Sequence, residues 1–280
     1  MGRLLGKGAF GNVYAVERNG EMGAMKLVSH TPANLRSSRV DPVAMLALES
    51  QIVTLMQGNP YIPKLLHAYA HSCNSRWHMC IFEQFSKGSL HSYVRNGNIL
   101  SHSQIFAIGW RVAEALQALF EQGWFHLDVK PANIMMSDDP QRLVALIDFG
   151  LAKPTLWEGR GESRSRNGTF MFMGTRVWDK QKESVRDDLE SLAFTLAWAM
   201  LGGKLPWSNM QKEDMQRHIQ APSLPSQLGR QCASPYLESF LSFVRHSPVG
   251  ALIMYSWAIA RLKTGEGAQE LRRSKRLKEA

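Results

Sequence analysis

Four polar residues near the middle of the chain have the types and the spacing needed to move a phosphoryl group. Asp128 is followed by Lys130 and Asn133, and Asp148 comes twenty residues after Asp128, behind the apolar run 143–147. Asp128 could accept the proton of a substrate hydroxyl, and Lys130 could neutralise charge on the phosphoryl group. Asn133 and Asp148 offer hard oxygen ligands, which suit Mg²⁺. Phosphoryl transfer needs mostly positioning and charge neutralisation, so this set predicts a phosphoryl-transfer site.

Each half of this pattern is weak when it is taken alone. An Asp-x-Lys-Pro-x-Asn sequence can be an ordinary turn, and an Asp-Phe-Gly sequence such as 148–150 is common by chance. The two halves nevertheless occur in the required order, and a short strand is expected directly before the second. We therefore favour one catalytic site over two unrelated turns.

The composition limits the class of protein. Of the 280 residues, 44% are hydrophobic and 20% are charged, which is ordinary for a soluble globular protein with one large domain or two lobes. The apolar runs 192–201 and 249–259 are shorter than the roughly 18 residues that a membrane span needs, so we expect buried helices and no membrane partner. The first residues are followed by no extended apolar region and do not indicate a signal peptide.

The cysteines indicate a reducing location. Cys73, Cys80 and Cys232 form no Cys-x-x-Cys pair, and their odd number argues against a disulfide framework. We therefore expect the protein in the cytoplasm, the nucleus or both.

A glycine-rich stretch near the N-terminus could cover a phosphate group. Its glycines, in the order Gly-x-Gly-x-x-Gly from residue 6 to residue 11, would let backbone amides approach phosphates closely. The same pattern occurs in dinucleotide-binding folds, where a helix follows it. Here a β-type run from Asn12 to Glu17 follows, and then a second strand around Lys26. We therefore favour a β-hairpin lid, with Val13 packed over a flat base.

A helix and a change of composition complete the expected N-terminal part. Apolar residues recur with helical period between 44 and 57, and Glu49 lies within that helix as the candidate partner of Lys26. Residues 65–69 and 79–82 are typical of strands, and turn chemistry follows them. The apolar stripe of 105–122 then predicts a core helix. We expect the β-rich part to end near residue 85.

The motifs around Asp128 and Asp148 resemble the catalytic loop and the metal-binding Asp-Phe-Gly of eukaryotic protein kinases. Three later stretches resemble the casein kinase one group, which includes the tau-tubulin and vaccinia-related kinases. They are Gly-Thr-Phe-Met-Phe-Met-Gly-Thr at 168–175, Arg-Asp-Asp-Leu-Glu-Ser-Leu at 186–192 and Leu-Pro-Trp at 205–207. That group lacks the Ala-Pro-Glu of other kinases, and so does this chain. The resemblance covers essentially the whole chain and is strongest between residues 6 and 207.

The resemblance implies an α+β, two-lobed protein kinase fold. Residues 1–85 would form a small β-rich N-terminal lobe with one helix, residues 86–262 a mainly helical C-terminal lobe, and residues 263–280 a basic tail. It also implies a monomer that binds ATP and Mg²⁺ and phosphorylates serine or threonine in protein substrates. His126 would be a structural hydrogen-bonding residue, and Asp188 would be a buried anchor beneath the catalytic loop.

The resemblance also assigns the site residues. Asp128 and Lys130 would be catalytic, and Asn133 and Asp148 would hold the metal. The positions expected at the nucleotide are Leu5, Gly6, Lys7, Gly8, Ala9, Phe10, Gly11, Val13, Ala24, Lys26, Glu49, Glu83, Phe85 and Met135. Among them, backbone groups near Glu83 and Phe85 would bind adenine.

The charge of the chain suggests the kind of protein that it phosphorylates. The formal net charge is +9, which alone does not distinguish nucleic acid, an acidic membrane and an acidic protein as partners. A basic cluster follows Asp148, where a kinase would receive its peptide: Arg160, Arg164, Arg166, Arg176, Lys180, Lys182 and Arg186. A second cluster lies in residues 272–278 and reads as a solvated helix end, with a nuclear localisation signal or nucleic-acid patch as the alternative. We expect acidic protein substrates and no nucleic-acid partner.

Two departures from the family pattern shape the expectations. Leu127 replaces the arginine that normally docks an activation-loop phosphate, so we expect activity without phosphorylation of Ser163, Ser165 or Thr169. Val185 replaces one of two adjacent arginines that bind an acidic or phosphorylated substrate residue, so a need for pre-phosphorylated substrates does not follow.

Two other functions remain as alternatives. A pseudokinase that binds ATP as a scaffold would transfer little phosphate, and Leu127 is the residue that suggests it. A small-molecule phosphotransferase with a similar His-x-Asp sequence would phosphorylate a small alcohol, but such enzymes lack the Asp-Asp-Leu-Glu-Ser-Leu anchor. Transfer of labelled phosphate to protein distinguishes the kinase from both.

Overall fold

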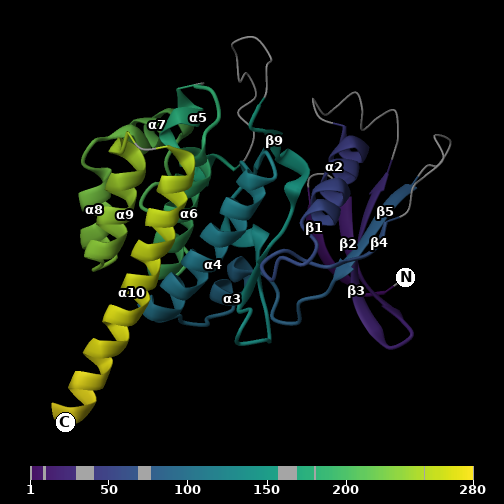
Figure 1. Cartoon of the computed structure of the whole chain (residues 1–280), viewed down its shortest axis with the longest axis horizontal. Helices are drawn as coiled ribbons and strands as arrows, with labels where there is room; N and C mark the ends of the chain where they lie inside the picture. Colours follow the sequence, from purple (N-terminus) through teal and green to yellow (C-terminus); the bar gives the residue numbers. More distant parts are fainter. Residues whose placement is uncertain are drawn as a thin grey trace.

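The computed structural model describes residues 2–8, 11–29, 41–68, 77–156, 169–179, 181–248 and 250–279, with the main chain alone for 268–279. A five-stranded antiparallel sheet with one helix forms a small lobe, and a larger lobe is mainly helical (Figure 1). The two-lobed α+β arrangement expected from the sequence is confirmed.

The sheet of the small lobe is built from consecutive antiparallel strands. They are β1 (Leu4–Gly8), β2 (Gly11–Arg18), β3 (Glu21–Ser29), β4 (Leu65–Ala68) and β5 (Trp77–Glu83), in the spatial order β1-β2-β3-β5-β4. Asn19 and Gly20 join β2 to β3 with φ angles of 53° and 81°. A two-residue turn with both φ angles positive matches the twist of the flanking strands, which is why an Asn-Gly pair stands here. This tight hairpin sets Val13 opposite Lys26.

The single described helix of the small lobe, α2 (Pro42–Leu55), connects the sheet to the Asp-Phe-Gly segment. Asp41 starts it by accepting a hydrogen bond from the Val43 backbone N–H at 2.9 Å, and Pro42 suits the first turn. Its buried face packs on β3, β5 and the short turn Phe149–Leu151. A Cβ added to Gly150 would lie 3.1 Å from the Met45 side chain, so the turn and the helix are closely packed.

The large lobe contains most of the helices. Its helices are α3 (Leu90–Arg95), α4 (His102–Glu121), α5 (Thr175–Trp178), α6 (Val185–Met200), α7 (Lys212–Gln220), α8 (Leu224–Gln231), α9 (Pro235–His246) and α10 (Ala251–Glu279). Two small two-stranded sheets lie on either side of the catalytic segments. One pairs β6 (Trp124–Phe125) with β9 (Lys153–Pro154), and the other pairs β7 (Ile134–Met136) with β8 (Val144–Leu146). Nearly every residue of α6 is buried, so this helix forms the centre of the lobe.

The last helix runs across the predicted boundary between the C-terminal lobe and the basic tail. The basic tail was expected to begin at residue 263, but α10 continues unbroken through that position. Lys263 lies 2.7 Å from Glu114 on α4, and Trp110 on α4 donates to Glu266 at 2.7 Å. These contacts attach residues 263–266 to the large lobe, and only the later part of α10 projects from it (Figure 1). The boundary expected between 262 and 263 therefore falls inside a packed helix.

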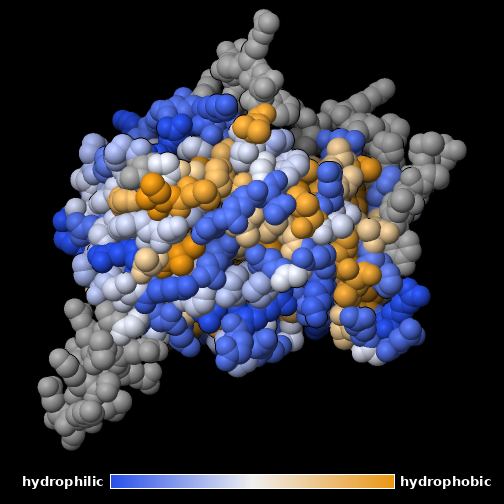
Figure 2. Space-filling model, in the orientation of Figure 1, coloured by the Kyte–Doolittle hydropathy of each residue, from blue (hydrophilic) through white to orange (hydrophobic). Residues whose placement is uncertain are grey.

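The surface of the described residues carries both hydrophilic and hydrophobic areas. Figure 2 shows hydrophilic residues over most of one face, interrupted by hydrophobic patches, including one over the strands of the small lobe. Among the helices that the structure describes, none is long and apolar enough to cross a membrane.

Candidate active site

The catalytic loop after β6 is held from below by Asp188. The carboxylate of Asp188, in the first turn of α6, accepts the backbone N–H of His126 at 2.8 Å and that of Leu127 at 2.7 Å. Leu127 has a φ of 64°, a conformation that costs a residue with a side chain about 1–2 kcal/mol. The two hydrogen bonds to a buried carboxylate offset that cost. The expectation that Asp188 anchors the loop is confirmed.

The ring of His126 also has a structural role, because it forms hydrogen bonds and a ring contact beside the catalytic loop. Its Nε2 lies 3.1 Å from the carbonyl oxygen of Ile147, and its Nδ1 accepts the backbone N–H of Asp128 at 3.2 Å. The ring meets Phe149 edge to face, with 5.1 Å between the centroids. His126 therefore ties the catalytic loop to the Asp-Phe-Gly segment, as expected of a hydrogen-bonding residue.

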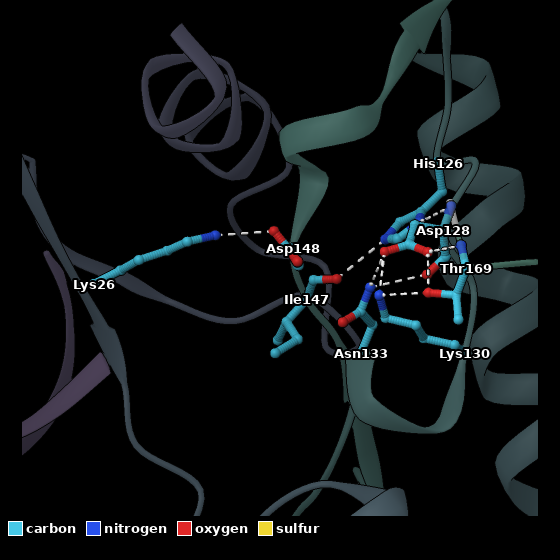
Figure 3. Close-up of polar contacts among 8 residues, drawn as sticks. All are labelled: Lys26, His126, Asp128, Lys130, Asn133, Ile147, Asp148 and Thr169. Atoms are coloured by element: carbon cyan, nitrogen blue, oxygen red, sulfur yellow. Dashed lines mark hydrogen bonds and ion pairs between the residues drawn. The ribbon is translucent and has the colours of Figure 1, made fainter. Parts of the chain in front are cut away.

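Asp128 is surrounded by donors from two segments of the chain (Figure 3). Lys130 Nζ and Asn133 Nδ2 donate to its Oδ2 at 2.5 and 3.1 Å. The backbone N–H and the hydroxyl of Thr169 donate to its Oδ1 at 3.1 and 3.2 Å. A carboxylate has about four acceptor positions, so these donors occupy all of them. A substrate hydroxyl must therefore replace one donor when it binds to Asp128.

Lys26 joins the small lobe to the Asp-Phe-Gly segment. Its Nζ lies 2.6 Å from Glu49 Oε2 and 2.9 Å from Asp148 Oδ1. Burial alone would lower the pKa of Lys26, but the two carboxylates raise it above the ordinary value, so the ammonium stays charged. Burial raises the pKa of Glu49, and Lys26 opposes that rise. The expected pairing of Lys26 with Glu49 is confirmed.

Asp148 is kept as a carboxylate although it is partly buried. Burial by itself would raise the pKa of Asp148, but the nearby charge of Lys26, helped by His126 and Lys130, holds it below the ordinary value. Its backbone φ of 66° is unusual for a residue with a side chain. Such strain is common at functional sites, because the surrounding structure must hold it.

The oxygen atoms available for a metal fit Mg²⁺. Asn133 turns its amide nitrogen to Asp128, and Figure 3 shows its amide oxygen on the side where Asp148 lies. Among the described residues, no group of three or more His, Cys, Asp or Glu side chains could hold a metal. Mg²⁺ is commonly held by one or two protein oxygens together with phosphate oxygens and water. Asn133 and Asp148 could hold the metal in this way, with the remaining ligands supplied by a nucleotide.

Two of the apolar residues expected around a base lie on neighbouring strands of the small lobe, and the third lies on β7. Val13 pairs with Lys26 across β2 and β3, and Ala24 pairs with Phe82 across β3 and β5. Val13, Ala24 and Met135 are all half-buried, as the walls of a slot for a flat ring would be. Their contact with a nucleotide stays a prediction.

The glycine-rich stretch is described in part. Leu5, Gly6, Lys7 and Gly8 belong to β1, whereas Ala9 and Phe10 lie outside the described residues. A Cβ on Gly11 would lie 2.5 Å from the Leu27 carbonyl oxygen, while one on Gly6 would meet nothing within 4 Å. A side chain at position 11 would clash with β3, so the close approach of that strand requires glycine here. The Gly-x-Gly-x-x-Gly pattern of the sequence did not indicate this reason.

The link between the lobes is fixed by an ion pair that the sequence did not indicate. Arg142 donates to both carboxylate oxygens of Glu83, at 2.9 and 2.5 Å, and to the Ile62 carbonyl oxygen at 2.9 Å. Its guanidinium also lies 4.9 Å from the ring centre of Phe85. The side chains of Glu83 and Phe85 are therefore turned toward Arg142. Of their backbone groups, the Glu83 N–H already donates to the Lys64 carbonyl oxygen, and the Phe85 carbonyl oxygen accepts from the Gly88 N–H.

Thr169 is a site residue that the sequence analysis considered only as a phosphorylation position. Its hydroxyl accepts from Lys130 Nζ at 3.0 Å and donates to Asp128, so it lies between the two catalytic residues (Figure 3). Its place in the motif Gly-Thr, just before a short apolar run, was the available signal. A phosphate on Thr169 would face the carboxylate of Asp128. Ser163 and Ser165 lie outside the described residues.

Glu190 holds the segment after the site. Its Oε2 accepts the backbone N–H and the hydroxyl of Thr175 at 2.8 and 2.9 Å. Its Oε1 lies 2.5 Å from Arg245 on α9, and both side chains are almost fully buried. Arg245 also donates to the carbonyl oxygens of Ala221 and Ile219. This buried pair fixes the start of α5 to the core of the large lobe.

The expectation for one basic residue is wrong. Arg186 was grouped with cations that could meet a peptide, but its guanidinium donates to the carbonyl oxygens of Val244, Arg245 and Ser247 at the end of α9. The last carbonyls of a helix lack partners within the helix, so they attract such a donor. Arg160, Arg164, Arg166 and Lys180 lie outside the described residues.

Comparison with known proteins agrees with this geometry. Residues 1–246 match the protein kinase domain, and the chain belongs to the protein kinase family. Over 220 residues it is 27% identical to a casein kinase I of Caenorhabditis elegans, and over 213 residues it is 27% identical to a casein kinase I homologue of Encephalitozoon cuniculi. These matches cover 74% and 73% of this chain. The resemblance to the casein kinase one group is thereby confirmed.

Another relative is matched at a similar level of identity. The cytokinesis protein sepH of Aspergillus terreus is 32% identical over 246 residues, which is 86% of this chain and 17% of that protein. The chain spans 61% and 63% of the two casein kinase relatives. As a family member, it has the fold of an enzyme that uses ATP with a divalent metal and acts on proteins.

Proposed function

We propose that this protein is an active serine/threonine kinase that transfers the γ-phosphate of MgATP to protein hydroxyl groups and favours acidic substrates. The observation that carries the proposal is the carboxylate of Asp128, held by Lys130, Asn133 and Thr169 beside the Lys26–Asp148 pair. The Lys26–Glu49 pair, which fixes the lysine of the small lobe, also supports the proposal.

The residues divide the work as follows. Asp128 orients the substrate hydroxyl and accepts its proton as the new bond to phosphorus forms. Lys130 and Lys26 neutralise phosphate charge, and Asn133 with Asp148 holds the metal. MgATP supplies the phosphoryl group, and ADP leaves. These are electrostatic tasks, and preorganised charges in an enclosed site perform them at little reorganisation cost.

Several features of the proposal combine the sequence with the surroundings of single residues. Lys130 followed by Pro131 favours serine or threonine over tyrosine as the acceptor, and the net charge of +9 favours acidic proteins. Leu127 packs against the hydrophobic core and offers no cation to a loop phosphate, so we infer activity without loop phosphorylation. We further propose that the protein works in the cytoplasm or nucleus, because the two described cysteines are free and buried. The resemblance to the casein kinase one group favours a monomer.

The proposal is tested with purified protein, labelled ATP and casein in the presence of Mg²⁺, Mn²⁺ or a chelator. We expect labelled casein with Mg²⁺, none with the chelator, and phosphoserine or phosphothreonine after hydrolysis of the product. Labelled phosphotyrosine would contradict the acceptor class. A folded protein that binds ATP but labels nothing would be a scaffold instead.

A further inference from the structure

The side chain of Trp110 on α4 is held by residues of the C-terminal helix α10. Its Nε1 donates a hydrogen bond to Glu266 Oε2 at 2.7 Å. The Nζ of Lys263 lies 4.4 Å from the centre of the Trp110 ring, and the guanidinium carbon of Arg111 lies 4.0 Å from it. An aromatic face attracts cations, and a hydrogen bond to a carboxylate is stronger than one between neutral groups. Lys263 and Glu266 therefore fix the position of this ring.

The contact requires α10 to lie close to α4. A Cβ added to Gly265 would lie 3.0 Å from the Phe106 ring, so glycine allows the two helices to approach at this point. Glu114 on α4 lies 2.7 Å from the ammonium of Lys263 and holds it near Trp110. The helix α10 begins at Ala251, beyond the residues 1–246 that match the protein kinase domain. The contact therefore adds an element from outside the matched residues to the large lobe.

Trp110 also contacts the small lobe, through Tyr61 in the segment between α2 and β4. The two rings meet edge to face, with 6.1 Å between the centroids and 89° between the planes. The Tyr61 backbone N–H donates to Asn59 Oδ1 at 2.9 Å, and the Asn59 N–H donates to the Met56 carbonyl oxygen at 3.1 Å. Tyr61 is therefore joined both to Trp110 and to the end of α2.

The backbone of Tyr61 leads on to the Asp-Phe-Gly segment. Its carbonyl oxygen accepts the Leu146 N–H at 2.9 Å, and Leu146 ends β8, two residues before Asp148. The helix α2, which ends shortly before Tyr61, carries Glu49, and Glu49 pairs with Lys26. A displacement of Tyr61 would therefore change the place of Lys26 between its two carboxylate partners.

We propose that Lys263 and Glu266 are positioning residues of the phosphoryl-transfer site. They hold Trp110 against Tyr61, and this contact sets α2 relative to the Asp-Phe-Gly segment. The proposal rests on the protein kinase activity proposed above, and it makes the first part of α10 a working component of the kinase. Neither residue touches a substrate. Both act through the orientation of Lys26, which determines how MgATP is held and how fast its phosphate is transferred.

The test compares the full-length wild type with Lys263→Met/Glu266→Gln. Met keeps an unbranched apolar side chain without the cation, and Gln keeps the shape of Glu without its charge. The control, Arg261→Met, removes a cation from the same helix. That guanidinium lies 4.7 Å from the ring centre of Tyr236 and donates to Ser239 Oγ on α9 at 2.7 Å, which are contacts within the large lobe. Each protein is characterised by its melting temperature, its MgATP affinity, and kcat and KM on casein.

We expect Lys263→Met/Glu266→Gln to lower kcat about three- to tenfold and to weaken MgATP binding by a similar factor, because only part of the lost interaction reaches Lys26. The KM for casein should change by less than about twofold, since the acceptor binds at Asp128 on the large lobe. Arg261→Met should lower the melting temperature to a similar extent and keep the wild-type kcat and affinity. Lys263→Arg, which retains a cation, should behave as the wild type.

A second background tests the path through Tyr61. In Tyr61→Leu the ring contact with Trp110 is already lost, so adding Lys263→Met/Glu266→Gln should change kcat by less than about twofold. An equal effect in both backgrounds would contradict this path.

The remaining outcomes separate the positioning role from the proposed activity. Unchanged kcat and MgATP affinity in Lys263→Met/Glu266→Gln would overturn the assignment, and so would equal losses in Arg261→Met, which would indicate a general effect of α10 on stability. If the wild type binds MgATP but phosphorylates no protein, the proposed activity fails, and the MgATP affinities alone decide whether α10 positions Lys26. A folded wild type that binds no MgATP would overturn both proposals.

Discussion

The ammonium of Lys26 lies 2.9 Å from a carboxylate oxygen of Asp148, although 122 positions separate the two residues in the chain. This contact joins the sheet of the small lobe to the Asp-Phe-Gly segment of the large lobe. It brings a cation and a metal-ligand carboxylate to the same space between the lobes. A nucleotide phosphate bound there would lie between the ammonium of Lys26 on the small lobe and a metal held at Asp148 on the large lobe.

Replacing Lys26 by Met should reduce kcat by about 100- to 1,000-fold, because it removes a preorganised charge from the phosphate site. Glu49 and Asp148 would then lack their shared cation, so we also expect weaker nucleotide binding. The measurement is steady-state phosphorylation of casein, with nucleotide affinity measured in parallel. Lys64→Met, at an exposed position of the loop before β4, is the control and should match the wild type. A Lys26→Met variant with wild-type kcat would show that Lys26 does not act on phosphate.

Replacing Thr169 by Val should lower kcat by about 10- to 100-fold, because Asp128 loses a hydrogen bond to its charged form. Thr169→Ser restores the hydroxyl and should restore most of the activity. Thr169→Glu should be inactive, since its carboxylate would lie against Asp128. A Thr169→Val variant as active as the wild type would mean that the hydroxyl has no part in positioning Asp128 or Lys130.

Replacing Glu190 by Gln should lower the free energy of unfolding by about 3–5 kcal/mol, because it leaves the guanidinium of Arg245 buried without its partner. The double variant Glu190→Gln/Arg245→Gln should lose less than the sum of the two single variants. Urea unfolding of all four proteins measures this coupling. Asp214→Asn, which breaks an exposed pair with Arg217, should change stability little. Additive losses at 190 and 245 would contradict a coupled pair.

Asp187 should make the stability of the protein fall as pH rises through the weakly acidic range. Burial raises the pKa of Asp187 from its ordinary value of 3.8 to about 7. Between pH 4 and pH 7 the folded protein therefore holds a proton that the unfolded chain has lost. The stabilisation that this bound proton gives to the folded state is complete below about pH 4 and is lost as pH rises toward 7. In total it amounts to a free energy of unfolding on the order of 3–4 kcal/mol.

Asp187→Asn isolates this effect, because Asn keeps an oxygen that can accept the Ser184 backbone N–H. The difference in unfolding free energy between wild type and Asp187→Asn should change by a few kcal/mol between pH 4 and pH 7, and should be flat above pH 8. A difference independent of pH would show that Asp187 is ionised throughout.

The sequence predicted the parts of the site that lie within motifs. Asp128, Lys130 and Asn133 share one short loop, so their proximity follows from the chain itself. Lys26 and Glu49 lie on a strand and a helix whose periodicity is readable, and a lysine facing a buried glutamate is a natural pairing. The β2–β3 turn at Asn19 and Gly20 was equally open to prediction, because its backbone conformation restricts the residue types.

Other contacts depend on packing that local patterns do not describe. Thr169 reaches Asp128 across 41 positions, and Arg245 reaches Glu190 across 55. The direction of Arg186 depends on where α9 ends in space, and a count of basic residues cannot reveal that. The boundary predicted at residue 263 depended on a change of composition, which does not show where α10 stops packing on α4. Tertiary contacts of this kind become visible only in the folded chain.

The most direct test of the central claim compares the wild type with Asp128→Asn in transfer of labelled phosphate from MgATP to casein. Asn keeps the shape of the side chain and removes its charge, so the variant should fold and bind ATP normally. We predict that the wild type labels casein and that the variant's rate is at least about 1,000-fold lower. Equal labelling by the two proteins, or no labelling by a folded wild type that binds ATP, would contradict the account.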